Sequence, residues 1–177
     1  KSTVEKYRVP QQKPPPSPGW KTFLKNHVRD LVSLDFFVVP TVTHKVLFIL
    51  LILAHDRRRV VHFNVTEHPT AQWTSQQIVE AFPWDTAPQY LLRNRDGVYG
   101  DQFQRRVKSL GIEEVLTAPR SPWQNAFVER VIGSIRREIL DHVVVLNERH
   151  LRRLLRQCVK YYNEWGLHGS LRMDALA

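Results

Sequence analysis

The chain has 177 residues, 42% hydrophobic and 24% charged, as expected of one globular domain with its own core. Its formal net charge of +9 indicates a polyanionic partner such as nucleic acid. The longest apolar run, 46–54, is too short to cross a bilayer, and a single cysteine excludes an internal disulfide framework and a cysteine-based zinc site.

The first 19 residues are predicted to be a leader outside the core. Prolines cluster between Pro10 and Pro18, which predicts a stiff, extended linker followed by a globular domain over 20–177. The chain does not begin with Met, so we expect it to be a fragment of something longer. Its start lacks the hydrophobic segment of a secretory signal, so we expect a cytoplasmic protein.

Hydrophobic periodicity predicts five strands and four helices after the linker. The predicted strands span 31–39, 46–53, 59–65, 89–93 and 112–118. The predicted helices span 70–82, 100–110, 125–140 and 147–165. Short connections between the first three strands favour an antiparallel meander, and the later elements alternate. We therefore expect an α/β, ribonuclease H-like fold, a five-stranded mixed sheet with helices on both faces.

Helix boundaries are marked by particular residues. Pro83 should end the first predicted helix, and Gly111 should stop the second. Asn147 is a good N-cap for the last helix, where Cys158 falls in the apolar stripe and is predicted to fill the core.

Acidic or amide side chains occur at three points that this fold can bring together. Asp35 lies inside the first strand, Asn94 and Asp96 follow the fourth, and Glu129 lies near the start of the third helix. Glu129 is about a quarter-turn from the middle of that helix's apolar stripe, within reach of a ligand at the sheet edge. Divalent metal ions need such oxygen ligands, so these four residues are candidate metal-binding and catalytic residues.

Cations gather around the second and third of these points, which suits a site where a phosphate backbone approaches bound metal. The candidate DNA-binding residues are Arg93, Arg95, Arg120, Trp123, Gln124, Asn125, Arg130 and Arg136. Trp123 lies in the loop before the third helix and is able to stack on a base. Gln124 and Asn125 either contact DNA or cap the helix.

From about residue 28 to 168, the chain resembles the integrase catalytic core of insertion-sequence transposases and retroviral integrases. Asp35 matches the family's first-strand Asp in its context. The segment Trp-Gln-Asn-Ala-Phe-Val-Glu, ending at Glu129, resembles the family's Asn-Ala-x-x-Glu segment.

The end of the chain carries a further part of this resemblance. Tyr161-Tyr162-Asn163, with His168 and Leu171 downstream, resembles a terminal Tyr-Asn…Arg-Pro-His…Leu signature. Gly and Leu stand here where Arg-Pro is usual.

The chain departs from the family at the second Asp, which usually lies five residues before an aromatic residue and within Asp-x-Gly. Counting back five from Tyr99 gives Asn94, with 34 residues (95–128) before Glu129. Asp96 stands directly before Gly97, with 32 residues (97–128) before Glu129. Register and spacing both favour Asn94 at the catalytic position, and Asp96 is the residue that would substitute for it.

The resemblance implies metal-dependent polynucleotidyl transfer, in which a water and then a DNA 3′-hydroxyl attack a phosphodiester. It implies two Mg²⁺ or Mn²⁺ ions, with Asp35 bridging both, Asn94 or Asp96 holding one and Glu129 the other. It also implies DNA element ends and target DNA as partners, a homo-oligomer assembled on DNA, no membrane, and a location in the bacterial cytoplasm.

Three hypotheses remain open from the sequence. The first is the catalytic domain of a transposase or integrase. The second is a catalytically impaired copy that acts only as a DNA-binding or dimerisation module, because Asn94 offers a neutral oxygen without the charge of a carboxylate. The third is a nuclease of the same fold that cleaves DNA without joining strands.

Overall fold

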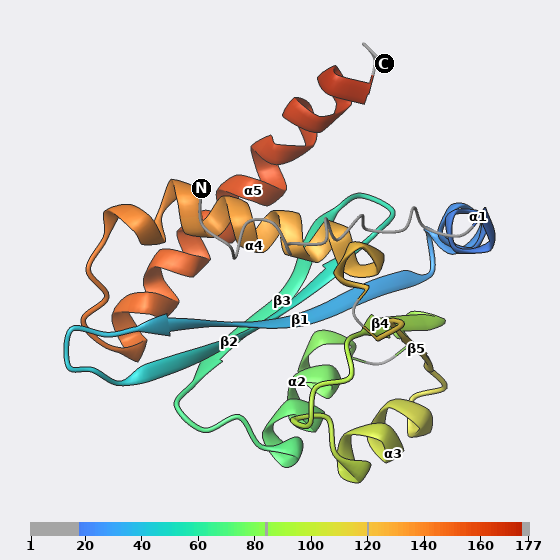
Figure 1. Cartoon of the computed structure of the whole chain (residues 1–177), viewed down its shortest axis with the longest axis horizontal. Helices are drawn as coiled ribbons and strands as arrows, with labels where there is room; N and C mark the ends of the chain where they lie inside the picture. The colour runs from blue at the N-terminus through green and yellow to red at the C-terminus, as the bar shows by residue number, and fades with distance from the viewer. Residues whose placement is uncertain (1–17, 84, 120, 175–177) are drawn as a thin grey trace, which may run out of the picture.

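A computed structural model of the chain describes residues 18–83, 85–119 and 121–174. The predicted linker lies almost wholly outside this range (Figure 1). The strands are β1 (Leu31–Pro40), β2 (Val46–Ala54), β3 (Arg59–Thr66), β4 (Tyr90–Arg93) and β5 (Glu113–Leu116). The helices are α1 (Pro18–His27), α2 (Ala71–Ala81), α3 (Asp101–Ser109), α4 (Ala126–Glu138) and α5 (Glu148–Asp174), with short 3-10 turns at Pro122–Asn125 and Leu140–His142.

The five strands form one sheet in the order β3-β2-β1-β4-β5. The first three strands pair antiparallel, because their short connections allow only hairpins. Strand β4 pairs parallel with β1, and β5 pairs parallel with β4, since helices α2 and α3 carry the chain back to the same end of the sheet. The predicted mixed sheet, which is ribonuclease H-like, is confirmed.

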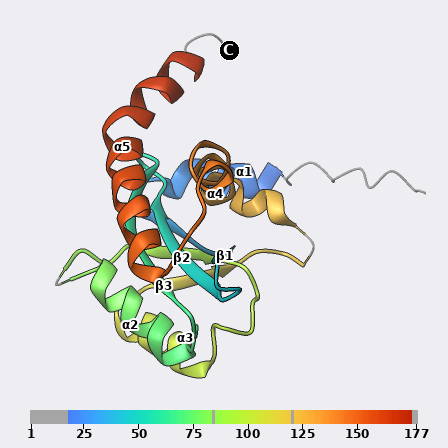
Figure 2. The ribbon, with the colours of Figure 1, turned by 90° about the vertical axis from the view of Figure 1, so that its left-hand side faces the viewer.

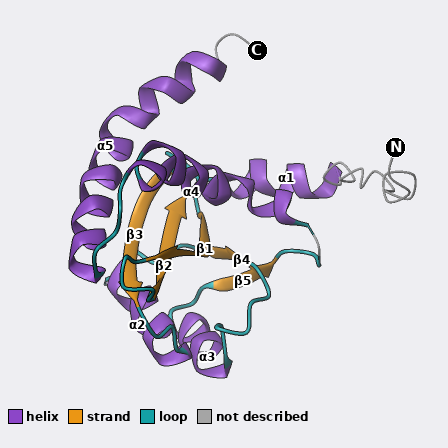
Figure 3. Cartoon of the chain, turned by 60° about the vertical axis from the view of Figure 1, so that its left-hand side comes forward, coloured by secondary structure: helices purple, strands orange, loops and turns teal. Residues whose placement is uncertain are grey.

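Helices cover both faces of the sheet, as the sequence predicts (Figures 2 and 3). Side chains alternate along β1, so Phe37 packs in the core beneath α4 and α5 while Leu34 packs in the core beside α2 and α3. Asp35 is two residues from Phe37 and shares its face. The strand interior therefore presents a carboxylate towards α4.

Several helix boundaries follow the predicted signals. Helix α2 ends at Ala81, two residues before Pro83. Its N-cap, Thr70, is not among the predicted signals and accepts a hydrogen bond from the Trp73 amide at 3.1 Å. Gly111, which follows the C-cap Leu110 of α3, has a φ of +73°, a conformation that glycine adopts without strain. Asn147 accepts a hydrogen bond from the His150 amide at 2.9 Å and so caps α5. Cys158 is buried, as predicted.

Helix α1 is not among the sequence predictions, and α5 is longer than predicted. Helix α1 is held by aromatic contacts that a linear pattern does not reveal. The rings of Phe23 and His27 lie 5.4 and 4.6 Å from that of Tyr90 at the start of β4. Strand β5 is shorter than predicted, ending at Leu116. Among the described residues, no helix is long and apolar enough to cross a membrane.

His55 follows β2 and is buried at the end of the sheet, with 4% of its surface exposed. Its ring shares a hydrogen bond with the Ser33 hydroxyl, and its amide donates to the Leu31 carbonyl at 3.0 Å. Burial, and secondarily the charge of Arg58, lower the pKa of His55 from 6.5 to about 4. The folded chain therefore keeps this imidazole neutral well below neutral pH.

We predict that this histidine makes the fold sensitive to acid. Between pH 6.5 and 4 the unfolded chain binds a proton at His55 that the folded chain excludes. The free energy of unfolding should therefore fall as the pH falls through this window, and the contribution of His55 to this loss is about 3 kcal/mol at most. Urea denaturation of wild type and His55→Gln at several pH values measures this. The variant should show a smaller loss between pH 7 and 4, and an unchanged loss would contradict the prediction.

Candidate functional site

The pairing of β1 with β4 places Asp35 beside Asn94. Leu31 lies opposite Tyr90 and Ser33 opposite Leu92, and the same offset of 59 puts Asn94, the first residue after β4, opposite Asp35. The Asn94 side-chain NH₂ donates a hydrogen bond to Asp35 Oδ1 at 3.3 Å. The strand pairing therefore supports the sequence preference for position 94.

Glu129 reaches the same region from the first turn of α4. Four residues before it, Asn125 is 4% exposed, and its NH₂ donates to the Leu34 carbonyl of β1 at 3.3 Å. This contact ties the start of α4 to the middle of β1. Because Glu129 is one turn further along the helix, it lies over the same part of the strand as Asp35.

A pocket of about 260 Å³ lies where these elements meet. Its walls come from β1, the loops after β4 and β5, and the start of α4, and its lining residues are Asp35, Asn94, Arg95, Thr117, Ala118, Pro119, Ser121, Asn125 and Glu129. Three of the four candidate metal-binding residues therefore share one pocket.

The fourth candidate, Asp96, is not among the residues that line the pocket. Its amide donates to Asn94 Oδ1 at 3.2 Å, and its own Oδ1 accepts a hydrogen bond from the Val98 amide at 3.4 Å. These bonds turn the Asp96 carboxylate along the loop. It nevertheless adds negative potential at Asp35.

The pocket raises the pKa of Asp35 from 3.8 to about 6. Burial is the largest cause, and the negative charges of Glu129 and Asp96 add to it. A hydrogen bond from the Phe36 amide, at 2.8 Å, acts in the opposite direction. The ionised form of this carboxylate is therefore disfavoured, and a cation bound beside it would stabilise that form.

The donors in the pocket fit a hard divalent cation. Asp35 and Glu129 supply carboxylates and Asn94 an amide, and Mg²⁺ prefers oxygen ligands of this kind. Asn125 lines the pocket, and its Oδ1 atom is buried with no hydrogen-bond partner within the described chain. No group of three His, Cys, Asp or Glu side chains is suited to a metal in 18–83, 85–119 and 121–174. The pocket offers two carboxylates and an amide in place of three acids.

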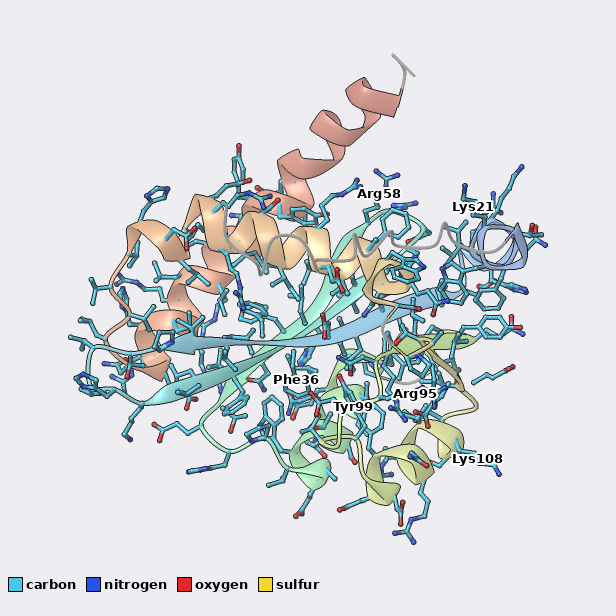
Figure 4. All side chains as sticks on the ribbon, viewed as in Figure 1. Lys21, Phe36, Arg58, Arg95, Tyr99 and Lys108 are labelled. Atoms are coloured by element: carbon cyan, nitrogen blue, oxygen red, sulfur yellow. The ribbon has the colours of Figure 1, made fainter. Side chains whose placement is uncertain are left out.

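Arg95 lies at the pocket, in a position suited to a phosphate. It is exposed, lines the pocket, and its Nε donates to the Thr117 carbonyl at 3.1 Å (Figure 4). Gln124 instead organises the loop, because its Oε1 accepts a hydrogen bond from the Ala118 amide at 2.6 Å. Neither Gln124 nor Asn125 is seen to cap α4 through its side chain, and Trp123 is half-buried in the 3-10 turn.

Arg93, expected from the sequence to bind DNA, is a structural residue in this fold. It is 4% exposed and forms an ion pair with Glu114. Its guanidinium also lies over the rings of Tyr99 and Phe103, at 4.8 and 5.6 Å, and donates to the Asn94 carbonyl at 3.0 Å. Because these contacts enclose the guanidinium, Arg93 is held in place and stabilises the loop that begins at Asn94.

The remaining candidate cations are spread over α4 and its approach. Arg120 lies outside the described residues. Arg136 is exposed, and its guanidinium lies 5.7 Å from the Phe37 ring, beyond the pocket. Arg130 follows Glu129 but lines a different pocket.

The sequence did not single out Thr117 and Ser121, which line the pocket after β5. A signal for Thr117 exists in the strand register, because β5 pairs with β4 so that Leu116 lies opposite Arg93. The next residue, Thr117, then lies beside Asn94. The position of Thr117 can therefore be predicted only once the order of the strands in the sheet is known.

We predict that Asp35 destabilises the metal-free fold at neutral pH. Because its pKa is raised, the folded chain holds a proton between pH 3.8 and 6 that the unfolded chain releases. Stability from this group is greatest below pH 3.8 and is lost as the pH rises to 6. Asp35→Asn should therefore stabilise the chain relative to wild type more at pH 7.5 than at pH 4, measured by urea denaturation with EDTA present. An equal difference at both pH values would contradict this.

Comparisons with known proteins give a family match over part of the chain. Residues 110–175 match the family model described as "Integrase core domain", a range that includes Glu129 and excludes Asp35 and Asn94. A search of curated proteins finds no match.

Solved structures match over more of the chain. One is a chain of the simian T-cell lymphotropic virus intasome in complex with PP2A regulatory subunit B56 gamma, with a TM-score of 0.60 and 15% identity over 72% of this chain. The match spans 47% of that chain, just under half its length. Another is the HTLV-2 integrase catalytic core domain in complex with magnesium, with a TM-score of 0.58 and 12% identity over 77% of this chain and 88% of that one. At these identities the structures show a shared fold. Residues 110–175 thus match the integrase core domain in sequence, and the chain shares the ribonuclease H-like fold of the retroviral integrase catalytic cores.

Proposed function

We propose that the chain is the catalytic core of a DNA transposase or integrase, which cleaves DNA strands and transfers them in a metal-dependent reaction. The observation that carries this proposal is that Asp35, Asn94 and Glu129, far apart in sequence, line one pocket. They do so on a fold shared with integrase cores, in a chain with a net charge of +9. The reaction class is metal-dependent phosphoryl transfer without a covalent protein intermediate.

Asp35, Glu129 and the amide oxygen of Asn94 would hold the divalent ions, for which we expect two Mg²⁺ or Mn²⁺. When bound, such ions activate an attacking hydroxyl and stabilise the leaving oxygen of a phosphodiester. Asn94 currently turns its NH₂ towards Asp35 and its oxygen towards the Asp96 amide. To offer an oxygen to a cation beside Asp35, this amide must rotate and give up the bond to Asp96.

Other residues of the pocket suit the binding of the reacting groups. Arg95 would pair with a phosphate oxygen at the edge of the pocket. The Asn125 Oδ1 atom would accept a hydrogen bond from a water or sugar hydroxyl, because it is buried there without a partner in the described chain. Both groups are held in place by the hydrogen bonds that their nitrogens donate to backbone carbonyls.

We also propose that 20–177 form the core domain and that it works on DNA ends and target DNA as a homo-oligomer. The HTLV-2 core is described in dimeric and trimeric forms, and the simian virus chain is part of an intasome. For this chain the supporting observations are its fold and its basic charge.

A second candidate function is DNA binding without chemistry, and Asn94 is the observation that favours it. An amide removes one negative charge from the cation site, and its NH₂ relieves the repulsion that a third carboxylate would create beside Asp35. The metal-free site is thereby stabilised, whereas its affinity for cations is lowered. The two functions differ in one measurable property, cleavage.

We predict that Asn94→Asp increases Mn²⁺-dependent nicking of supercoiled plasmid by roughly a hundredfold, because it restores charge at the reacting centre. Glu129→Ala should abolish nicking. Glu138→Ala is the matched control, since Glu138 is an exposed acid on the same helix outside the pocket, and it should nick like wild type.

Other results would assign the site differently. If wild type and Asn94→Asp nick equally while Asp96→Asn does not nick, Asp96 completes the site. If neither wild type nor Asn94→Asp nicks but both bind DNA, the binding-only function is correct. Nicking that yields no joined product with a pre-cut DNA end would identify a nuclease.

We predict a parallel change in metal affinity. Mn²⁺ should raise the melting temperature of Asn94→Asp more than that of wild type, because a ligand that binds only the folded state stabilises it more the more tightly it binds. Differential scanning fluorimetry across a Mn²⁺ titration at pH 7.5 measures this. Equal Mn²⁺-induced shifts in melting temperature for the two proteins would show that position 94 does not contact the metal.

A further inference from the structure

We propose that a second pocket, between the β2–β3 turn, α4 and α5, binds a backbone phosphate of DNA outside the catalytic pocket. The proposal rests on the DNA-processing function proposed above and adds a contact point for the substrate. This pocket has a volume of about 130 Å³, and its polar lining consists of Arg58, Arg130, Ser134 and Tyr162. Among the described residues that line it, none is acidic.

The β2–β3 turn positions Arg58, the first of the two arginines in this pocket. Arg58 has a φ of 48°, a left-handed conformation, and its amide donates to the His55 carbonyl at 3.4 Å. Its guanidinium lies 5.2 Å from the centre of the Phe127 ring. The centres of the His55 and Phe127 rings lie 5.1 Å apart in a T-shaped arrangement. Arg58 is therefore positioned by stacking as well as by its turn.

Helix α4 supplies the second cation and a hydroxyl. Arg130 and Ser134 are four residues apart and so lie on the same side of the helix, above Phe127. Glu129 precedes Arg130 by one residue, which separates their directions by about 100° around the helix axis. The start of α4 thus presents a carboxylate to one pocket and a guanidinium to the other.

Helix α5 closes the pocket through Tyr162, and the neighbouring Asn163 holds it there. The Asn163 Oδ1 accepts a hydrogen bond from the Val60 amide at 2.9 Å, and its NH₂ donates to the Val60 carbonyl at 3.0 Å. This pair of bonds ties α5 to β3 next to the turn. Burial raises the pKa of the Tyr162 hydroxyl, while Arg58 and Arg130 act in the opposite direction. The hydroxyl remains a hydrogen-bond donor at neutral pH.

The chemistry of this lining matches a phosphodiester. Two guanidinium groups supply charge and paired donors, and two hydroxyls supply further donors. The Phe127 ring beneath them holds Arg58 in place. The contact carries no base specificity, so it would serve to position DNA. Figure 4 places Arg58 above α4 and Arg95 below it, on the loop after β4. A strand that passes the start of α4 would meet both pockets.

The test is the salt dependence of duplex DNA binding, measured by fluorescence anisotropy with a labelled oligonucleotide and EDTA present. Arg58→Gln and Arg130→Gln should each reduce the slope of log Kd against log salt concentration by about one, as for the loss of one phosphate contact. Arg106→Gln is the matched control, because Arg106 is an exposed arginine of α3 on the other side of the sheet, and its slope should equal that of wild type. Tyr162→Phe and Ser134→Ala remove only hydroxyls and should weaken binding several-fold while leaving the melting temperature unchanged.

The outcomes separate this proposal from the proposed function. If wild type binds DNA and nicks it but Arg58→Gln and Arg130→Gln match Arg106→Gln, the phosphate pocket is wrong and the proposed function stands. If inorganic phosphate binds the pocket in calorimetry and Arg58→Gln abolishes that binding without changing the DNA slope, the pocket serves a free anion and the proposal is overturned. If wild type does not bind DNA, the proposed function fails together with it.

Discussion

The parallel pairing of β1 with β4 is the constraint on which the candidate site depends. Its register sets Asn94 directly beside Asp35, and the Asn125–Leu34 hydrogen bond then brings α4 over the same point. The first contact is set by the pairing of the strands and the second by a backbone carbonyl of β1, so the positions of the polar side chains depend on the sheet. A shift of one residue in the β1–β4 register would turn the Asp35 carboxylate and its neighbour away from each other.

The site shows how one amide changes the balance of charge in a carboxylate pocket. Asp35 already has a raised pKa from burial and from two neighbouring acids. A third carboxylate at position 94 would add to this repulsion, whereas the Asn94 NH₂ donates to Asp35 instead. The metal-free fold is stabilised by an interaction that a bound cation would have to replace. Stability and cation affinity are therefore opposed at this position.

Much of the fold was predictable because its signals are local. Hydrophobic periodicity gave the strands and helices, and residues such as Gly111 and Asn147 marked boundaries through their own backbone or capping preferences. Helix α1 was missed because it is held by contacts of Phe23 and His27 with Tyr90, far along the chain. Arg93 was misassigned for the same reason, since its partner Glu114 lies on a neighbouring strand.

The sequence by itself determined the order of elements from β1 onwards, the mixed sheet, and the short set of polar residues from which a site can be made, because these depend on residue type and spacing. Only the tertiary structure decided which of them meet. It placed Asn94 in the pocket and turned Asp96 along the loop, although both are near the end of the same strand. It also set Arg58 against Arg130 and Tyr162. Contacts between distant segments depend on strand register and helix packing, which residue spacing alone does not specify.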